Sequence, residues 1–160
     1  MKAQKGFTLV EILIVVVILG ILAAIVVPQF TQASTEAKVS SSLSSLQSLR
    51  SQIELYRIQH NDNPPTLALF EEAMTMCSGP TASVDTDYVA VAGVNRATHP
   101  FGPYMANIPL NPWNNSRTVV AADAAGAGWV YDAATGAIHI GVTDAPATAT
   151  QTLQDADGAL

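Results

Sequence analysis

The chain has 160 residues, which is enough for one small domain and an appendage. Only 12% of the residues are charged, and the net charge of −6 is unevenly distributed: residues 1–60 carry five basic and three acidic side chains, whereas residues 61–160 carry two basic and ten acidic ones. The acidic part repels phosphate backbones, so nucleic-acid binding is not expected. The single cysteine, Cys77, excludes an internal disulfide.

The most apolar part of the chain is residues 7–27, where Thr8 and Glu11 are the only polar side chains. As a helix, these residues would be about 32 Å long, which matches the hydrocarbon core of a bilayer. Lys2 and Lys5 precede the segment. The positive-inside tendency therefore places the N-terminus in the cytoplasm and the rest of the chain across one membrane-spanning helix.

Three explanations of this segment compete, and Glu11 separates them. A cleaved secretory signal has a shorter apolar run without an acid. A plain anchor leaves Glu11 unexplained, because a carboxylate costs roughly 2.5–3.5 kcal/mol at the centre of a membrane helix and less near its end. Cleavage between Gly6 and Phe7 would instead create an amine four residues before Glu11, and a helix brings such positions together. The paired amine would belong either to the same subunit or to a neighbouring one, where the pair would set the packing register.

The basic leader, Gly6, the sequence FTLVE and the apolar stretch that ends near Pro28 resemble the signal of type IV pilins and type II secretion pseudopilins. Within this family the chain is most similar to the major, G-type pseudopilin. The resemblance implies cleavage after Gly6 by a prepilin peptidase, N-methylation of Phe7 and a role for Glu11 in assembly. It also implies a helix that loosens between Gly20 and Pro28 in the filament, which agrees with the weak helix propensity of both residue types.

Residues 29–59 have the spacing of an amphipathic helix that turn formers and two prolines end at residues 61–65. The apolar side chains recur every three or four positions and form a stripe that can pack on a sheet: Val39, Leu43, Leu46, Leu49, Ile53 and Tyr56. Serines occupy much of the remaining surface. They either allow helices of neighbouring subunits to approach closely or simply face solvent.

The elements beyond this helix are predicted to be short. They are a helix at 66–76, a strand at 88–91 and three strands at 117–121, 128–132 and 137–142, the last two joined by a hairpin turn. Phe101, Tyr104 and Trp113 are expected to pin the proline-rich loop before the strands, and its NPW sequence again resembles pseudopilins. Residues 143–160 contain few bulky side chains and are predicted to be disordered.

The expected fold class is therefore α+β and pilin-like, with a long N-terminal helix packed on a small antiparallel sheet. Its expected parts in chain order are a leader peptide at 1–6, a transmembrane and filament-core helix at 7–28, an amphipathic helix at 29–60, a globular lobe at 61–142 and a disordered tail at 143–160.

The sequence shows no catalytic constellation, so an enzyme is not expected, and no cofactor is predicted. The resemblance raises the question of calcium, which major pseudopilins commonly bind in an acid-rich loop near the C-terminal sheet. The matching loop here offers only Asp123. Other acids form isolated pairs, namely Asp85 with Asp87 and Asp155 with Asp157. Calcium is therefore the less favoured alternative, because this ion requires six or more oxygen ligands.

The resemblance implies a structural subunit of a type II secretion pseudopilus that polymerises from the inner membrane and drives protein export. Its implied partners are further copies in a homo-oligomeric filament, the prepilin peptidase, an inner-membrane assembly platform and minor pseudopilins. The lobe would be periplasmic, and the filament periplasmic or extracellular. The alternative is a type IV pilus subunit for adhesion, motility or DNA uptake. Adhesive pilins often close a C-terminal loop with a disulfide, and the single cysteine therefore favours the pseudopilin.

Overall fold

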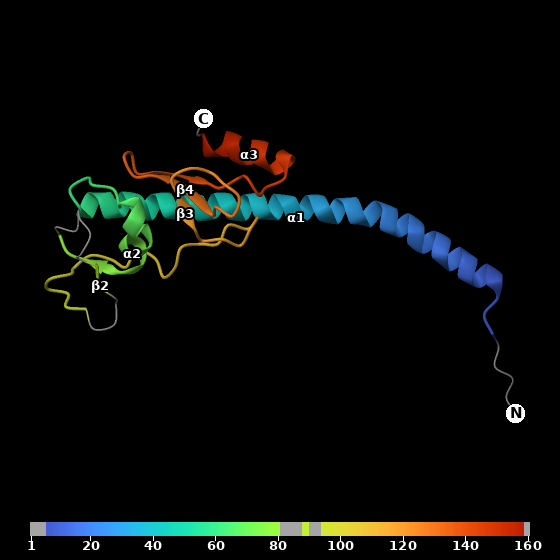
Figure 1. Cartoon of the computed structure of the whole chain (residues 1–160). Helices are drawn as coiled ribbons and strands as arrows, with labels where there is room; N and C mark the ends of the chain where they lie inside the picture. The colour runs from blue at the N-terminus through green and yellow to red at the C-terminus, as the bar shows by residue number, and fades with distance from the viewer. Residues whose placement is uncertain (1–5, 81–87, 90–93, 159–160) are drawn as a thin grey trace, which may run out of the picture. The chain divides into compact units, whose positions relative to one another are not determined.

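A computed structural model describes residues 6–80, 88–89 and 94–158, and the chain divides into two compact units, Met1–Ala37 and Lys38–Leu160. Figure 1 shows the order of the elements along the chain. The first unit contains the apolar half of helix α1, and the second contains the remainder of α1 together with every other helix and strand among the described residues. We refer to the second unit as the lobe.

Helix α1 comprises residues Leu9–Gln59 and confirms the prediction of a long N-terminal helix. Its backbone is α-helical through both Gly20 and Pro28. The predicted loosening of this segment concerns the filament and stays a prediction. Within the described residues, α1 is the one helix long and apolar enough to cross a membrane.

The lobe half of α1 buries the predicted apolar stripe. Leu46, Leu49, Ile53 and Tyr56 are at most 2% exposed, and Val39 and Leu43 pack against the same core. Ser42 lies on the same face of the helix, three residues after Val39 and four before Leu46, and it is also buried. The spacing of three and four residues thus places one face of the helix against the rest of the lobe, as amphipathic patterning requires.

The second helical segment is confirmed as a short 3₁₀ turn, η1 (Leu67–Leu69), that continues into α2 (Phe70–Thr75). Phe70, Ala73 and Met74 are its buried side chains. Two antiparallel strands follow, β1 (Cys77–Ser78) and β2 (Tyr88–Val89). The predicted strand at 88–91 is therefore confirmed in its first half, and its second half lies outside the described residues.

The main sheet has the strand order β3 (Val119–Val120), β4 (Trp129–Asp132) and β5 (Ala137–Ile140). The hairpin between β4 and β5 is confirmed, but β3 pairs with β4 in parallel, so the sheet is mixed rather than antiparallel. The loop at 121–128 carries the chain back to the start of β3, so that β4 runs beside β3 in the same direction. A loop of this length suffices because β3 has only two residues. The α+β pilin-like arrangement is otherwise as predicted.

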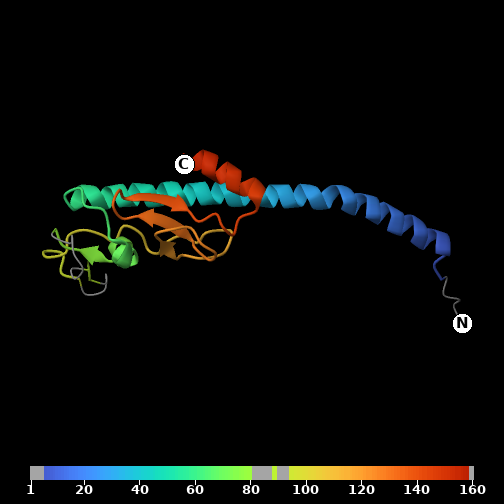
Figure 2. The ribbon, with the colours of Figure 1, turned by 45° about the horizontal axis from the view of Figure 1, so that its top comes forward.

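The C-terminal residues correct a second prediction. Instead of a disordered tail, residues Ala147–Asp157 form helix α3, which contacts β5 and ends at the left-handed Gly158. Figures 1 and 2 both show α3 beside the part of α1 that belongs to the lobe. Ala149 and Leu153, one helical turn apart, are 1% and 0% exposed. Two well-placed side chains on one face therefore order this helix although its composition is poor in bulky residues.

Aromatic residues fix the proline-rich loop to the other elements, as expected. The Tyr104 hydroxyl donates a 2.6 Å hydrogen bond to Oε1 of Gln59 in α1. The rings of Phe101 and His60 meet edge to face, with their centroids 5.3 Å apart. Lys38 Nζ lies 5.3 Å from the centroid of the Trp113 ring, which is within the range of a cation–π interaction.

Candidate processing and assembly site

The predicted cleavage point is accessible in the structure. Gly6 and Phe7 precede α1 in a non-helical segment, and the Phe7 side chain is 82% exposed. A Cβ atom placed on Gly6 would have no neighbour within 4 Å, so space within the chain does not require glycine there. A requirement for Gly6 would therefore come from another molecule that binds this segment.

Glu11 lies in the first turn of α1, where it bonds to Thr8. The backbone N–H and the hydroxyl of Thr8 donate to Glu11 Oε2 at 2.9 and 2.8 Å, and the Glu11 N–H donates to Thr8 Oγ1 at 3.2 Å. This reciprocal arrangement is a capping box, which satisfies N–H groups that the first turn of a helix leaves without partners. Glu11 is thus a helix-capping residue in the uncleaved chain.

The capping role of Thr8 has a signal in the sequence. Thr8 and Glu11 have the Thr-x-x-Glu spacing of a capping box immediately before an apolar run. Hydrogen bonding to Thr8, and not only a positive charge, can therefore satisfy the Glu11 carboxylate. The cap shows that Glu11 has a partner of its own before any cleavage takes place.

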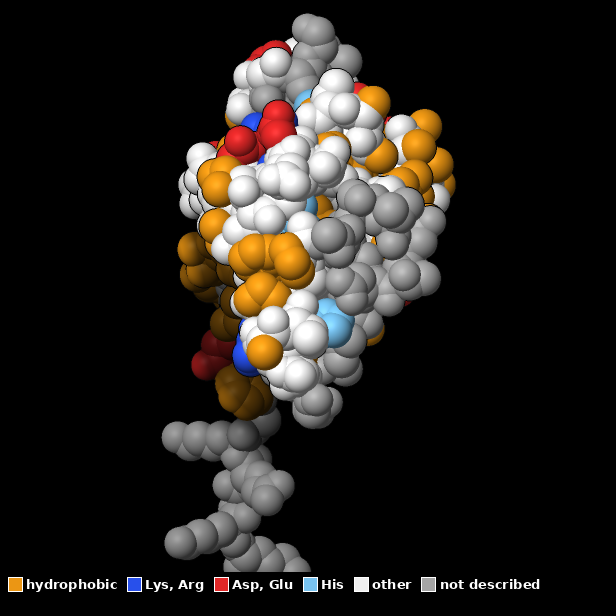
Figure 3. All heavy atoms as spheres, turned by 90° about the vertical axis from the view of Figure 1, so that its left-hand side faces the viewer, with side chains coloured by type: hydrophobic (Ala, Val, Ile, Leu, Met, Phe, Trp, Pro, Cys, Tyr) orange, Lys and Arg blue, Asp and Glu red, His pale blue; other side chains and the backbone are white. Residues whose placement is uncertain are grey.

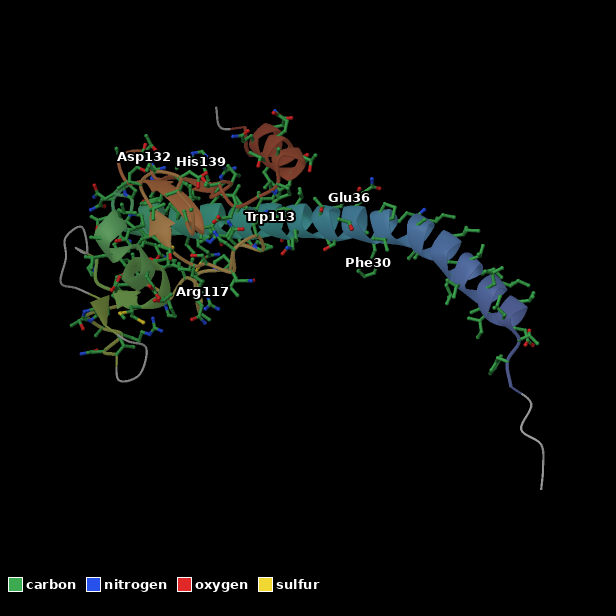
Figure 4. The ribbon with its side chains drawn as sticks, turned by 45° about the vertical axis from the view of Figure 1, so that its right-hand side comes forward. Phe30, Glu36, Trp113, Arg117, Asp132 and His139 are labelled. Atoms are coloured by element: carbon green, nitrogen blue, oxygen red, sulfur yellow. The ribbon has the colours of Figure 1, made fainter. Side chains whose placement is uncertain are left out.

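The apolar side chains that follow Glu11 are exposed along this part of α1. From Ile12 to Val27 the large apolar side chains are between 51% and 63% exposed, and Phe30 is 77% exposed. Figure 4 shows the labelled Phe30 side chain projecting away from α1. Burying an aliphatic side chain contributes roughly 1.5–3 kcal/mol, so a surface of this size requires lipid or neighbouring helices.

Gly20 and Pro28 lie on this exposed part of α1. A Cβ on Gly20 would meet nothing within 4 Å, so the glycine is not required by packing within the chain. Pro28 provides no N–H for the carbonyl four residues earlier, which leaves the helix one hydrogen bond short at this point. Both residues therefore lower the intrinsic stability of the helix, and their role in assembly stays a prediction.

The acids considered for calcium do not come together in the described part of the chain. Asp123 is in the loop between β3 and β4, whereas Asp155 and Asp157 belong to the last turn of α3, so the DADG sequence is a helix end and not a calcium loop. Asp85 and Asp87 lie outside the described residues. Among those described, no three His, Cys, Asp or Glu side chains form a group that could hold a metal. Figure 3 shows one end of the lobe, where most of the described side chains are hydrophobic or uncharged.

An exposed apolar helix that begins with a short basic segment and a lone acid, joined to a small α+β lobe, defines a type IV pilin-like protein. Residues 1–27 match the prokaryotic N-terminal methylation motif. The chain belongs to the family of the type II secretion system core protein G, the G-type pseudopilins, because its similarity to members of that family extends far beyond the motif.

The relatives bear this name in several bacteria. The chain is 32% identical over 114 residues to the type II secretion system core protein G of Pseudomonas aeruginosa, covering 71% of each chain. It is 30% identical over 116 residues to that of Klebsiella pneumoniae, covering 72% of this chain and 73% of the relative. The protein of Aeromonas hydrophila is 30% identical over 115 residues, with 71% of each chain covered. No solved structure gives a significant match.

Proposed function

We propose that this protein is a structural subunit of a type II secretion pseudopilus, cleaved after Gly6, N-methylated at Phe7 and polymerised from the inner membrane to drive protein export. The observation that carries the proposal is the exposed apolar surface of α1 between Ile12 and Val27. Lipid covers this surface while the subunit waits in the membrane. In the filament, the helices of neighbouring subunits replace the lipid, so extraction does not expose the surface to water.

Cleavage changes the electrostatic situation of Glu11. In the described chain its carboxylate accepts hydrogen bonds from Thr8 only. Removal of the leader creates a positive α-amino group on Phe7, beside Thr8. A carboxylate in an apolar environment is stabilised by a nearby cation, and the amine of the same subunit or of a neighbour supplies one. Pairing between subunits would set the register of the packed helices.

The charges that flank α1 orient the subunit. Lys2 and Lys5 hold the N-terminus on the cytoplasmic side, where the prepilin peptidase removes the leader. The lobe then lies in the periplasm. The partners in this proposal are further copies of the chain, the inner-membrane assembly platform and minor pseudopilins. The role is mechanical rather than enzymatic, and it uses no cofactor.

Processing tests the proposal directly. Gly6→Ala should abolish the shortening of the chain on an immunoblot of cells that contain a prepilin peptidase, and filaments should be lost with it. Because a Cβ at Gly6 meets no atom within 4 Å, the substitution leaves the fold of the chain unchanged. Gly20→Ala, which is equally free of contacts, is the matched control and should be shortened normally. Normal shortening of the Gly6→Ala chain would refute cleavage at this site.

A further inference from the structure

Three segments that are distant in sequence meet beside the main sheet of the lobe. They are the loop that contains Asn111 and Asn114, the loop at 121–128 between β3 and β4, and residues 141–144 after β5. Their backbones approach closely: a Cβ on Gly141 would lie 2.4 Å from the carbonyl oxygen of Ala127. The side chains that bridge these segments therefore hold the loop at 121–128 against the other two segments.

Asp144 forms the central bridge. Its Oδ2 atom accepts hydrogen bonds from the Asn114 side-chain amide at 2.8 Å and from the Gly126 backbone N–H at 2.7 Å. The same Asn114 amide also donates to the carbonyl of Ala127 at 2.8 Å. One carboxylate oxygen thus joins all three segments. Hydrogen bonds to an ionised carboxylate are stronger than those between neutral groups.

Asp123 makes a second bridge in the opposite direction. It projects from the β3–β4 loop, and its Oδ2 atom accepts the backbone N–H of Val142 at 3.1 Å. The β3–β4 loop therefore donates a hydrogen bond from the Gly126 N–H to Asp144, which follows β5. Through its own Asp123 it also accepts a hydrogen bond from the Val142 N–H. Two such crossing bonds fix both the position and the direction of the loop relative to the sheet.

These contacts leave a calcium ion without a suitable set of ligands. Calcium requires six to eight oxygen ligands, usually including several carboxylates. Here the Oδ2 atoms of Asp144 and Asp123 already accept hydrogen bonds from N–H groups, whose positive ends repel a cation. The Ala127 carbonyl is likewise occupied by the Asn114 amide. The residues present do not fit the ion that the resemblance to major pseudopilins suggests for this loop.

We propose that hydrogen bonds close the β3–β4 loop of this subunit in place of a metal ion, with Asp144 joining Asn114 to Gly126 and Asp123 holding Val142. We call this set of residues the Asp144 latch: Asn114, Asp123, Gly126, Val142 and Asp144. It makes the fold of the lobe independent of calcium. The pKa of Asp144 agrees with this geometry, because the hydrogen bond from Asn114 and then that from Gly126 hold it below its ordinary value.

The test follows urea unfolding of the full chain in detergent by tryptophan fluorescence, which reports on the lobe because both tryptophans, Trp113 and Trp129, lie there. The unfolding midpoint should be the same with calcium as with a chelator. Asp144→Asn should lower the midpoint equally in both conditions. Glu71→Gln, which also removes one exposed negative charge, should leave it unchanged. A midpoint that rises with calcium in the wild type, and not in Asp144→Asn, would overturn the proposal.

A second variant keeps the proposal testable if Asp144→Asn fails to fold. Asn114→Asp replaces the amide donor with a second carboxylate facing Asp144. The like charges should lower the midpoint in the presence of the chelator, and added calcium should restore part of the loss. An unchanged midpoint for Asn114→Asp in the chelator would show that the Asn114 amide does not close the loop. The experiment measures lobe stability alone, so its failure would leave the proposed role in the filament untouched.

Discussion

Thr8 and Glu11 hold the first turn of α1 by reciprocal hydrogen bonds, in which the Thr8 N–H and hydroxyl donate to Glu11 Oε2 and the Glu11 N–H returns a bond to Thr8 Oγ1. The acid in the apolar segment therefore has two separable capacities. As an acceptor it caps the helix, and as a charge it can neutralise an amine. Capping requires no second molecule, whereas the register of a filament does.

Two substitutions of Glu11 separate these capacities. Glutamine keeps the acceptor that the Thr8 N–H requires but has no charge, whereas leucine removes both. We expect both variants to insert into the membrane and both to form far fewer filaments, because each lacks the partner of the Phe7 amine. Filament yield, measured by shearing and immunoblotting, checks this. Wild-type yield from Glu11→Gln would limit the role of Glu11 to capping.

Leu153→Ala should detach α3 from the lobe. Leu153 is fully buried and, with Ala149, forms the apolar face of this helix. Truncation of a buried leucine typically costs about 2–5 kcal/mol, which is more than a short helix rich in threonine can recover from its own propensity. Limited proteolysis should then cut within residues 147–157. Thr152→Ala, at an exposed position of the same helix, should remain as resistant as the wild type.

Asn111→Ala should destabilise the lobe strongly. The buried Asn111 amide donates to the carbonyls of Gly128 and Gly141 at 3.0 and 2.8 Å, and its oxygen accepts the backbone N–H of Trp113 at 3.0 Å. Each buried polar group left without a partner costs roughly 1–3 kcal/mol. The urea midpoint should fall well below that of Asn107→Ala, where the side chain is exposed. Equal midpoints would contradict the bridging role of Asn111.

Acid should weaken the lobe through Asp144 and Asp132. Hydrogen bonds lower the pKa of both carboxyls in the folded state: from the Thr135 hydroxyl and then the Ala134 N–H for Asp132, and from Asn114 and then Gly126 for Asp144. A depressed folded pKa adds stability above the ordinary aspartate pKa of about 3.9, and this stability is lost as the pH falls through the folded value.

Urea midpoints measured from neutral pH down to the acid limb test this expectation. Asp144→Asn removes one of the two contributions, so its midpoint should decline less steeply with acid than that of the wild type. Glu71→Gln, which removes an exposed carboxylate outside these contacts, should decline as steeply as the wild type. A parallel decline in Asp144→Asn and wild type would show that the carboxyl is not held in its ionised form by the fold.

Local patterns in the sequence determined the long helix, its apolar half and the N-terminal methylation motif. The buried stripe from Val39 to Tyr56 could be predicted because a helix repeats every 3.6 residues, so neighbours on its face are near in sequence. The hairpin of β4 and β5 was predictable for a related reason, since a short turn fixes the pairing of adjacent strands. The capping box was equally local and was within reach of the same reasoning.

Only the tertiary structure decided the parallel pairing of β3, the order of α3 and the Asp144 latch. Asn114 and Asp144 are 30 residues apart, and no periodicity links them. Leu153 orders a weak helix only because it is buried in the core of the lobe, which includes Ile138 and Ile140 of β5. Contacts between distant segments depend on where the whole chain places them. Composition, which suggested a disordered tail at 143–160, carries no information about that placement.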